Sequence, residues 1–246
     1  MHIKKLTLLL VPLLLSCVPV DPRPTNDEKA SAINVQLGMG YMQQNNLVVA
    51  NEKLLKALRQ NPKSASAHNA YAILQDRLQV KDKAAYHYKK ATSLDPNDSQ
   101  AANNYGAFLC RNNQEAKSEK YFLQALKNPL YKTPEFAYTN AALCVLKIKQ
   151  RDKAIVYLGK ALAANSNFPI ALAAMAKITF DDQNFKQAKI YLDRYHLVAR
   201  PTARSLWLTI RTELALGSYY DVDELAVQLQ KDFPDSDEYQ SWLAIQ

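Results

Sequence analysis

The sequence predicts an all-α fold, an α-solenoid of about six stacked helix-turn-helix repeats. The first observation is a period, because residues of one kind return every 34 positions, with a single slip of two residues near the middle of the chain. The second is composition: only five glycines interrupt a chain rich in residues that favour helix. The third is a proline at or near the end of each period, where one helix must give way to the next.

Three core positions recur in each period: a small residue, a large apolar residue four positions later, and a small residue three positions after that. The last two periods keep this spacing with substitutions. This pattern is the signature of the tetratricopeptide repeat, in which each unit buries its apolar face against its neighbours. The triplets are Ala50, Leu54 and Ala57; Ala84, Tyr88 and Ala91; Ser118, Phe122 and Ala125; Ala154, Leu158 and Ala161; Ala188, Leu192 and Tyr195; Val222, Ala226 and Leu229.

The period sets the expected domain boundaries. The period shifts by two residues between Asn128 and Glu135. The two extra residues lie between two prolines and lengthen the turn there. After the last repeat, Ser236 or Asp237 can cap a short terminal helix that ends near Trp242. Within a repeat region spanning 30–246 we expect repeats at 31–64, 65–98, 99–132, 135–168, 169–202 and 203–236, followed by this capping helix.

Residues 1–16 have the pattern of an export signal. Lys4 and Lys5 precede the apolar segment 6–15, which at ten residues is too short to span a bilayer. The run from Leu14 to Cys17 resembles the bacterial lipoprotein box, in which the cysteine is acylated and becomes the first residue of the mature chain. The alternative is an ordinary cleaved signal followed by a chance cysteine.

The residues after Cys17 predict where the chain is anchored. Val18 follows the cysteine where an aspartate would favour retention at the inner membrane, so by resemblance to lipoprotein sorting we expect the outer membrane. Residues 17–29 contain closely spaced prolines that favour an extended chain. We interpret them as a tether that holds the repeats ~35 Å from the bilayer at ~3 Å per residue.

Cys110 and Cys144 are the two cysteines left once Cys17 is assigned to the lipid. An exported chain enters an oxidising compartment, where an even pair of cysteines favours a disulfide. Both cysteines fall on the first helices of neighbouring repeats, whose axes lie ~10 Å apart, so a disulfide that pins repeats three and four is possible. The alternative is two buried thiols that pack as small apolar side chains.

The composition gives no sign of catalysis, metal binding or nucleic-acid binding. The formal charge of +8 comes from interleaved basic and acidic residues rather than from one basic cluster. The histidines and cysteines lack metal-ligand spacing, and no serine has the context of a nucleophile elbow. We therefore expect no enzyme, no cofactor, no metal and no nucleic-acid partner.

The inner surface of the solenoid is the predicted binding site. In such a stack the second, fifth, ninth, twelfth and thirteenth residues of each unit point inward from the first helix. In repeat one these positions hold an apolar cluster of Val35, Met39 and Met42, and exposed apolar clusters mark interaction sites. The alternative is that the two methionines are core residues covered by the tether. Repeat one has no lysine or arginine at these positions, so a clamp for a terminal carboxylate is not expected there.

Further along the inner surface, polar residues occupy the same positions. Asn69 and Asn103 lie one repeat apart, and their side chains can hydrogen-bond an extended peptide backbone. The full set of residues predicted to bind a partner is Val35, Met39, Met42, Asn69, Ile73, Asn103, Ala107 and Arg111.

Several local runs, together with the lipoprotein box, resemble the type IV pilus biogenesis/stability lipoproteins, the PilF/PilW pilotin group. The runs are Ala-Ser-Ala-Ile-Asn-Val-Gln-Leu-Gly at 30–38, Asn-Asn-Tyr-Gly-Ala-Phe-Leu-Cys at 103–110, Asn-Pro-Leu-Tyr-Lys-Thr-Pro at 128–134, Asn-Ala-Ala-Leu-Cys at 140–144 and Ser-Leu-Trp-Leu-Thr-Ile-Arg at 205–211. The paired cysteines and the turn between them are the most specific parts of the resemblance, because the repeats alone are generic.

The resemblance implies a non-enzymatic, monomeric lipoprotein on the periplasmic face of the outer membrane. Members of the family help the pilus secretin to reach the outer membrane or to assemble in it, so a secretin subunit is the expected partner. The alternative function is a periplasmic repeat lipoprotein that serves β-barrel assembly or a cell-wall enzyme.

Overall fold

The computed structural model describes residues 24–245 and contains thirteen α-helices and no strand over that range. The predicted all-α fold is therefore confirmed. The helices are α1 (Asn26–Gln43), α2 (Leu47–Gln60), α3 (Ala65–Arg77), α4 (Lys81–Leu94), α5 (Ser99–Arg111), α6 (Glu115–Ala125), α7 (Pro134–Lys147), α8 (Arg151–Ala164), α9 (Pro169–Asp181), α10 (Phe185–Val198), α11 (Ala203–Leu216), α12 (Tyr219–Asp232) and α13 (Asp237–Leu243).

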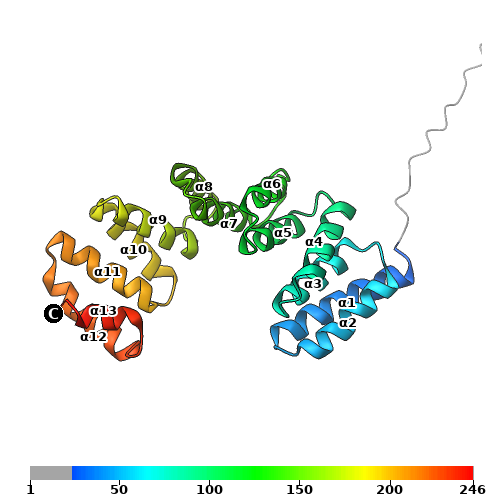
Figure 1. Ribbon diagram of the computed structural model, residues 1–246, viewed down its shortest axis with the longest axis horizontal. Helices are drawn as coiled ribbons and strands as arrows, with labels where there is room; N and C mark the ends of the chain where they lie inside the picture. Colours follow the sequence, from blue (N-terminus) through cyan, green and yellow to red (C-terminus); the bar gives the residue numbers. More distant parts are fainter. Residues whose placement is uncertain (1–23, 246) are drawn as a thin grey trace, which may run out of the picture.

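The helices form six hairpins that stack into an arch, with α1 near one end and α13 near the other (Figure 1). The backbones of successive odd-numbered helices pack closely from α1 to α11, whereas those of successive even-numbered helices from α2 to α12 do not. Even-numbered helices meet only through side chains, as where Lys153 of α8 pairs with Glu119 of α6. A stack whose one row is closer packed curves toward that row. The odd-numbered helices α1 to α11 therefore line the concave side, which we call the inner surface.

The turn of each hairpin contains one residue in the left-handed backbone conformation, so the backbone repeats with the sequence. Positive φ angles recur at the fifteenth position of each predicted repeat, at Asn45, Gln79, Asn113, Lys149, Gln183 and Gly217. The first five have φ between 57° and 61°, and the sixth is a glycine with φ of 80°. Only glycine adopts this conformation without a steric penalty, so the sixth hairpin has the least strained turn.

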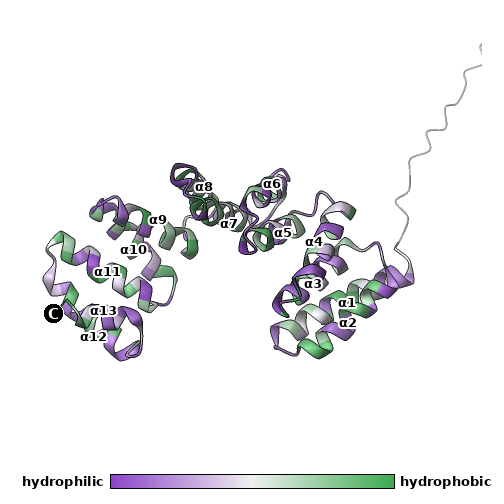
Figure 2. Cartoon of the chain, in the orientation of Figure 1, coloured by the Kyte–Doolittle hydropathy of each residue, from purple (hydrophilic) through white to green (hydrophobic). Residues whose placement is uncertain are grey.

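The triplets of the 34-residue period form the core. Leu54, Phe122 and Leu158 are fully buried, and each stabilises the fold by about 1.5–3 kcal/mol. The two helices of a hairpin approach so closely that there is room only for glycine at two positions. A Cβ on Gly38 would lie 2.5 Å from Leu54, and one on Gly106 would lie 2.7 Å from the ring of Phe122. Figure 2 shows hydrophilic and hydrophobic residues alternating along the helices, as expected when each helix buries one face.

The first helix begins earlier than the sequence suggested. Thr25 accepts a hydrogen bond from the backbone amide of Glu28 at 3.2 Å, and the Glu28 carboxylate accepts one from the amide of Thr25 at 2.6 Å. This reciprocal cap starts the helix at Asn26. The prediction that the extended tether continues to residue 29 is therefore wrong for 26–29, which form the first turn of α1.

The predicted export signal at 1–16, the predicted acylation site Cys17 and the predicted tether as far as residue 23 lie outside the described residues. None of the helices between residues 24 and 245 combines the length and the apolar character needed to cross a bilayer.

Candidate protein-docking surface

The apolar cluster predicted at repeat one is largely closed by its neighbours. Met42 has only 4% of its surface exposed and packs in one core cluster with Tyr71 and Leu74 of α3. Val35 and Met39 are half-buried at the edge of this cluster. The prediction that Met42 lies open to a partner is wrong, because α2 and α3 rather than the tether cover it.

The asparagines of the inner surface bond to one another. The side-chain amide of Asn104 donates to Asn69 at 3.2 Å, and that of Asn140 donates to Asn103 at 3.0 Å. Asn69 is half-buried, whereas Asn103 has 4% of its surface exposed. The prediction that Asn103 reaches the backbone of a bound peptide is therefore wrong, since its oxygen is already paired and its side chain is buried between α5 and α7.

In repeats two to four, a basic side chain at the end of the first helix bonds to the first helix of the preceding repeat. Arg77 donates to the backbone oxygen of Met42 at 2.6 Å, and Lys147 donates to that of Cys110 at 2.7 Å. Both oxygens belong to the last turn of a helix, where a positive charge is stabilised by the helix dipole. Arg111 instead forms an ion pair with Asp76 of α3. The cations of repeats two to four thus join neighbouring helices of the stack.

A small hollow of about 440 Å³ lies between α5 and α7. Two of the predicted partner-binding residues, Ala107 and Arg111, line it together with Leu143 and Lys147. Ile73, also predicted, is half-buried between two core clusters. The structure therefore brings Ala107 and Arg111 together at a hollow near the middle of the stack. The other apolar members of the predicted set gather in the core cluster of repeats one and two, where they form packing rather than an open site.

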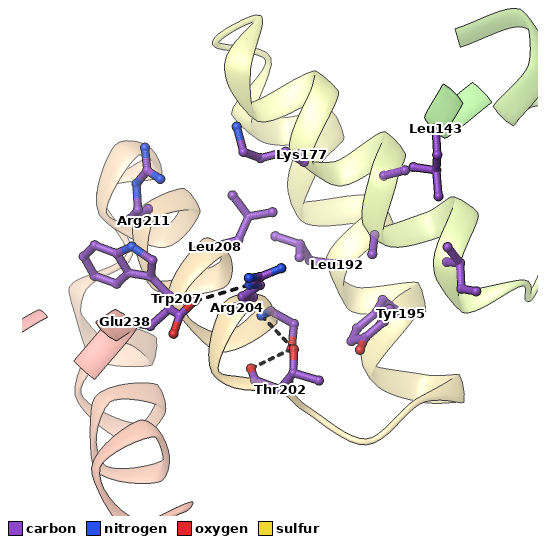
Figure 3. Close-up of a pocket in the computed structure, with 14 residues that line it drawn as sticks. Leu143, Lys177, Leu192, Tyr195, Thr202, Arg204, Trp207, Leu208, Arg211 and Glu238 are labelled. Carbon is purple, nitrogen blue, oxygen red and sulfur yellow. Dashed lines mark hydrogen bonds and ion pairs between the residues drawn. The ribbon is translucent and has the colours of Figure 1, made fainter. Parts of the chain in front are cut away.

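A larger hollow of about 600 Å³ lies over the last two repeats, within the range typical of ligand pockets. Figure 3 shows the aliphatic side chains of Leu192 and Leu208 between the ring of Trp207 on one side and that of Tyr195 on the other. The hollow draws on α7, α9, α10, α11 and α13. It is lined by Leu143, Ile170, Ala173, Ala174, Lys177, Leu192, Tyr195, Thr202, Arg204, Ser205, Trp207, Leu208, Arg211 and Glu238.

Positive charge surrounds this hollow. Its lining includes Lys177, Arg204 and Arg211 but one carboxylate, that of Glu238. The guanidinium of Arg211 lies 4.4 Å from the centroid of the Phe180 ring and 5.8 Å from that of Trp207, distances at which the cation is attracted to the rings. An apolar floor with a basic rim suits a partner that carries both apolar and acidic side chains.

The predicted partner-binding residues end in repeat three, although the register of inward positions continues to the end of the stack. The same register gives Ile170, Ala173 and Lys177 in repeat five, and Arg204, Trp207 and Arg211 in repeat six. All six line the larger hollow.

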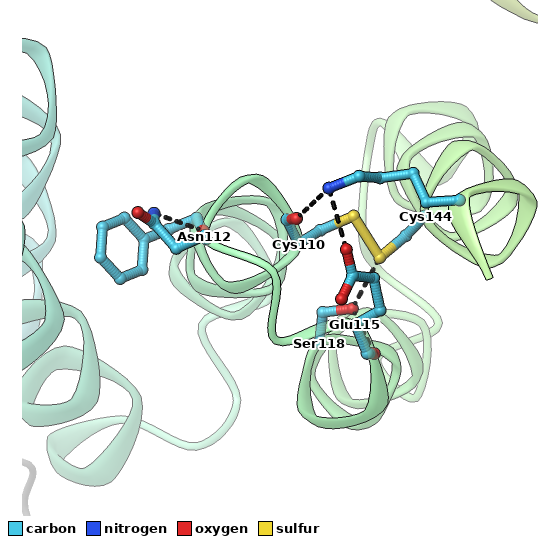
Figure 4. Close-up of a disulfide and its surroundings, with 7 residues drawn as sticks. Cys110, Asn112, Glu115, Ser118 and Cys144 are labelled. Carbon is cyan, nitrogen blue, oxygen red and sulfur yellow. Dashed lines mark hydrogen bonds and ion pairs between the residues drawn. A yellow bond between two sulfur atoms is a disulfide. The ribbon is translucent and has the colours of Figure 1, made fainter.

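A disulfide joins Cys110 of α5 to Cys144 of α7, with their Cα atoms 5.8 Å apart (Figure 4). The hydroxyl of Ser118 lies 2.9 Å from the sulfur of Cys144. Both cysteines are buried. The bond closes the turn between α6 and α7, where the period slips, and its oxidation in solution stays a prediction.

The second repeat holds a pair of histidines. The Nδ1 atoms of His68 and His87 lie 2.8 Å apart, and His68 Nε2 lies 3.1 Å from the backbone oxygen of Pro62. Since that oxygen can only accept, His68 donates through Nε2, and its Nδ1 accepts from His87. Burial lowers the pKa of His87 to about 4, aided by the neighbouring His68 and Lys83. Burial also lowers the pKa of His68.

No group of three or more histidine, cysteine or carboxylate side chains within residues 24–245 is arranged to hold a metal ion. The side chains that gather on the inner surface are apolar, amide and charged, with the charged ones mostly cationic around the larger hollow. Such a set can recognise another protein by contact and charge.

Comparison with known proteins identifies a tetratricopeptide repeat in the chain and relatives that act in type IV pilus assembly. The tetratricopeptide repeat profile matches residues 87–120. The type IV pilus assembly protein PilF of Pseudomonas aeruginosa is 31% identical over 226 residues, which cover 92% of this chain and 89% of that protein.

Two solved structures are similar along nearly their whole length. The structure from the functional characterisation of Pseudomonas aeruginosa PilF superposes with a TM-score of 0.84 at 30% identity, covering 90% of this chain and 100% of that one. The crystal structure of PilW, described as a widely conserved type IV pilus biogenesis factor, has a TM-score of 0.78 at 35% identity and covers 87% of this chain and 98% of that one.

Proposed function

Because the chain belongs to the family of the type IV pilus biogenesis proteins PilF and PilW, we propose that it is a pilotin, a non-enzymatic assembly factor for the pilus secretin. The observation that carries this proposal is the family relationship over the whole repeat region, joined to an inner surface suited to protein contact. The rival role in β-barrel assembly or with a cell-wall enzyme has no comparable support.

The proposed mechanism combines an anchor with a docking surface. Acylated Cys17 holds the monomeric protein on the periplasmic face of the outer membrane, and several acyl chains give a stable attachment where one chain would be marginal. The inner surface binds a segment of a secretin subunit. Because both partners are then confined to one surface, subunits meet at a high local concentration, which promotes ring assembly.

Two variants at the start of the mature chain test the anchor. Cys17→Ala removes the acylation site and leaves the repeats folded, so we expect a mislocalised protein and few secretin multimers on a gel that preserves them. Val18→Asp is the matched control, because it keeps the lipid but should retain the protein at the inner membrane. Normal multimers in both variants would contradict the proposed mechanism.

Affinity capture of the acylated protein separates the proposed partner from the rival one. We expect a secretin subunit to be enriched in the captured material. Enrichment of a β-barrel assembly protein or a cell-wall enzyme in its place would favour the alternative function.

A further inference from the structure

The larger hollow over repeats five and six differs in chemistry from the rest of the inner surface. Ile170, Leu192 and Leu208 give it an apolar floor. Trp207 is half-buried beside them and is the type of side chain that most often dominates a protein interface. An apolar partner side chain that enters here is removed from water on several sides, which supplies affinity in proportion to the area buried.

Arg211 is held in place while its donors stay open. Its guanidinium lies over Phe180 and Trp207, and within residues 24–245 no carboxylate forms an ion pair with it. An arginine that is already oriented loses little freedom when it binds a carboxylate with two parallel hydrogen bonds. The site is therefore built to receive a negative group.

The other two cations have weak or local partners. Lys177 pairs with Asp181 one turn further along α9, at 2.6 Å. Arg204 lies 3.7 Å from Glu238, but 93% of its side chain is exposed, so this pair holds it only loosely. A partner carboxylate can compete for both.

The spacing of the cations distinguishes a terminal carboxylate from acidic side chains. Arg204 and Arg211 are seven residues apart on α11, which places them about 10 Å apart along the helix axis at 1.5 Å per residue. To converge on one carboxylate, Arg204 would have to leave Glu238, and Arg211 would have to leave the aromatic rings beneath it. Several acidic side chains along a segment can reach these cations at the same time.

We propose that this hollow binds a partner segment in which large apolar side chains are flanked by aspartate or glutamate residues. The apolar side chains enter the hollow against Trp207 and Leu208, and the carboxylates pair with Arg211, Lys177 and Arg204. The inference rests on the proposed function only for the identity of the partner, since the chemistry of the hollow defines the segment by itself.

Trp207 provides a direct readout. The chain has two tryptophans, and the other, Trp242, is 9% exposed in the terminal cluster. In a Trp242→Phe background the emission of the full-length acylated protein, kept in detergent, reports on the hollow alone. The probe is the blocked peptide acetyl-Asp-Glu-Leu-Phe-Asp-Glu-amide, whose ends carry no charge.

Three further peptides are the matched controls. Lysine and arginine replace the acidic residues in the first, and alanines replace Leu-Phe in the second. The third is acetyl-Ser-Gln-Leu-Phe, whose side chains are uncharged and whose only charge is its free terminal carboxylate. We expect a saturable change in Trp207 emission with the acidic peptide, at least tenfold tighter than with any control and weaker at high salt. Equal binding of the acidic and basic peptides, or tighter binding of the free carboxylate, would overturn the proposal.

Variants locate the site. Arg211→Glu and Lys177→Glu each should weaken the acidic peptide at least tenfold, and Lys177 is exposed enough that its replacement leaves the fold intact. Lys231→Glu makes an equal charge change at an exposed residue of α12 outside the hollow, and it should leave binding unchanged. The proposal fails if Arg211→Glu and Lys231→Glu act alike, or if Trp207 emission changes with protein concentration alone, which would assign the hollow to a second copy of the chain.

The two proposals fail in different ways. If Cys17→Ala leaves secretin multimers intact while the acidic peptide still binds, the pilotin mechanism is contradicted and the hollow is supported. If Cys17→Ala blocks multimers but the hollow does not discriminate by charge, the pilotin mechanism is supported and the hollow is not its docking site.

Discussion

The two halves of the inner surface share one backbone pattern, but they differ in whether their inward-pointing side chains are accessible to a partner. In repeats one to three, Met42 and Asn103 are buried, and the basic Arg77 and Arg111 are bonded to the first helix of the preceding repeat. In repeats five and six the equivalent face is an apolar hollow with a basic rim. The 34-residue period therefore determines the shape of the stack, whereas the residues at its inward positions decide where a partner can bind.

The largest expected effect concerns the bond near the boundary of the two halves. We expect Cys110→Ser combined with Cys144→Ser to lower the free energy of unfolding by about 3–4 kcal/mol, because the disulfide closes a loop of about 35 residues. Urea denaturation of the oxidised protein and of the variant measures the difference. A reductant should destabilise the parent protein by a similar amount and leave the variant unchanged. An equal midpoint for all samples would show that the cysteines are not bonded in solution.

Replacing one glycine in repeat three and one in repeat four compares a tightly packed site with an open one. Gly106→Ala should destabilise by about 1–3 kcal/mol, because its new Cβ would lie 2.7 Å from the buried, rigid ring of Phe122. Gly159→Ala is the matched control on α8, where nothing lies within 4 Å of the new Cβ. There we expect a gain of about 0.5–1 kcal/mol from helix propensity. Thermal or urea unfolding measures both, and the same sign for the two would contradict this packing.

The histidine pair gives the first half a pH dependence that the second half lacks at the equivalent position. Since burial lowers the pKa of His87 to about 4, from 6.5 in an unfolded chain, the unfolded state binds the proton more readily. The stabilisation is complete above about pH 6.5 and is lost as the pH falls toward 4. Because His87 is only half-buried, solvent screening reduces the effect to about 1–2 kcal/mol.

The difference between the parent protein and His87→Gln isolates this contribution, because acidic groups titrate in the same range in both. We expect the stability curve of His87→Gln to fall less between pH 7 and pH 4.5. Parallel curves would show that His87 titrates as in an unfolded chain.

Much of the fold followed from periodic residues, since Leu54, Phe122 and Leu158 recur at fixed spacing and are fully buried. The docking surface was harder to predict. An inward position can be open or closed depending on side chains of the next repeat, as when α3 covers Met42. No property of Asn103 itself indicates that Asn140, 37 residues later, bonds to it. Trp207 lies at an inward position of the period, but that position alone does not show whether its ring is buried or open to a partner.

A variant at Asn140 tests whether the row of asparagines closes the inner surface of repeats two to four. Asn140→Ala removes the donor to Asn103 and leaves its buried oxygen unpaired, which should cost about 1–2 kcal/mol in the free energy of unfolding. Asn97→Ala is the matched control, because Asn97 is exposed and its side chain makes no hydrogen bond within residues 24–245. Urea denaturation should show a loss for the first variant and a change below about 0.5 kcal/mol for the second. If both are neutral, the asparagine row does not close the inner surface, and repeats two to four are as open to a partner as the basic hollow beyond them.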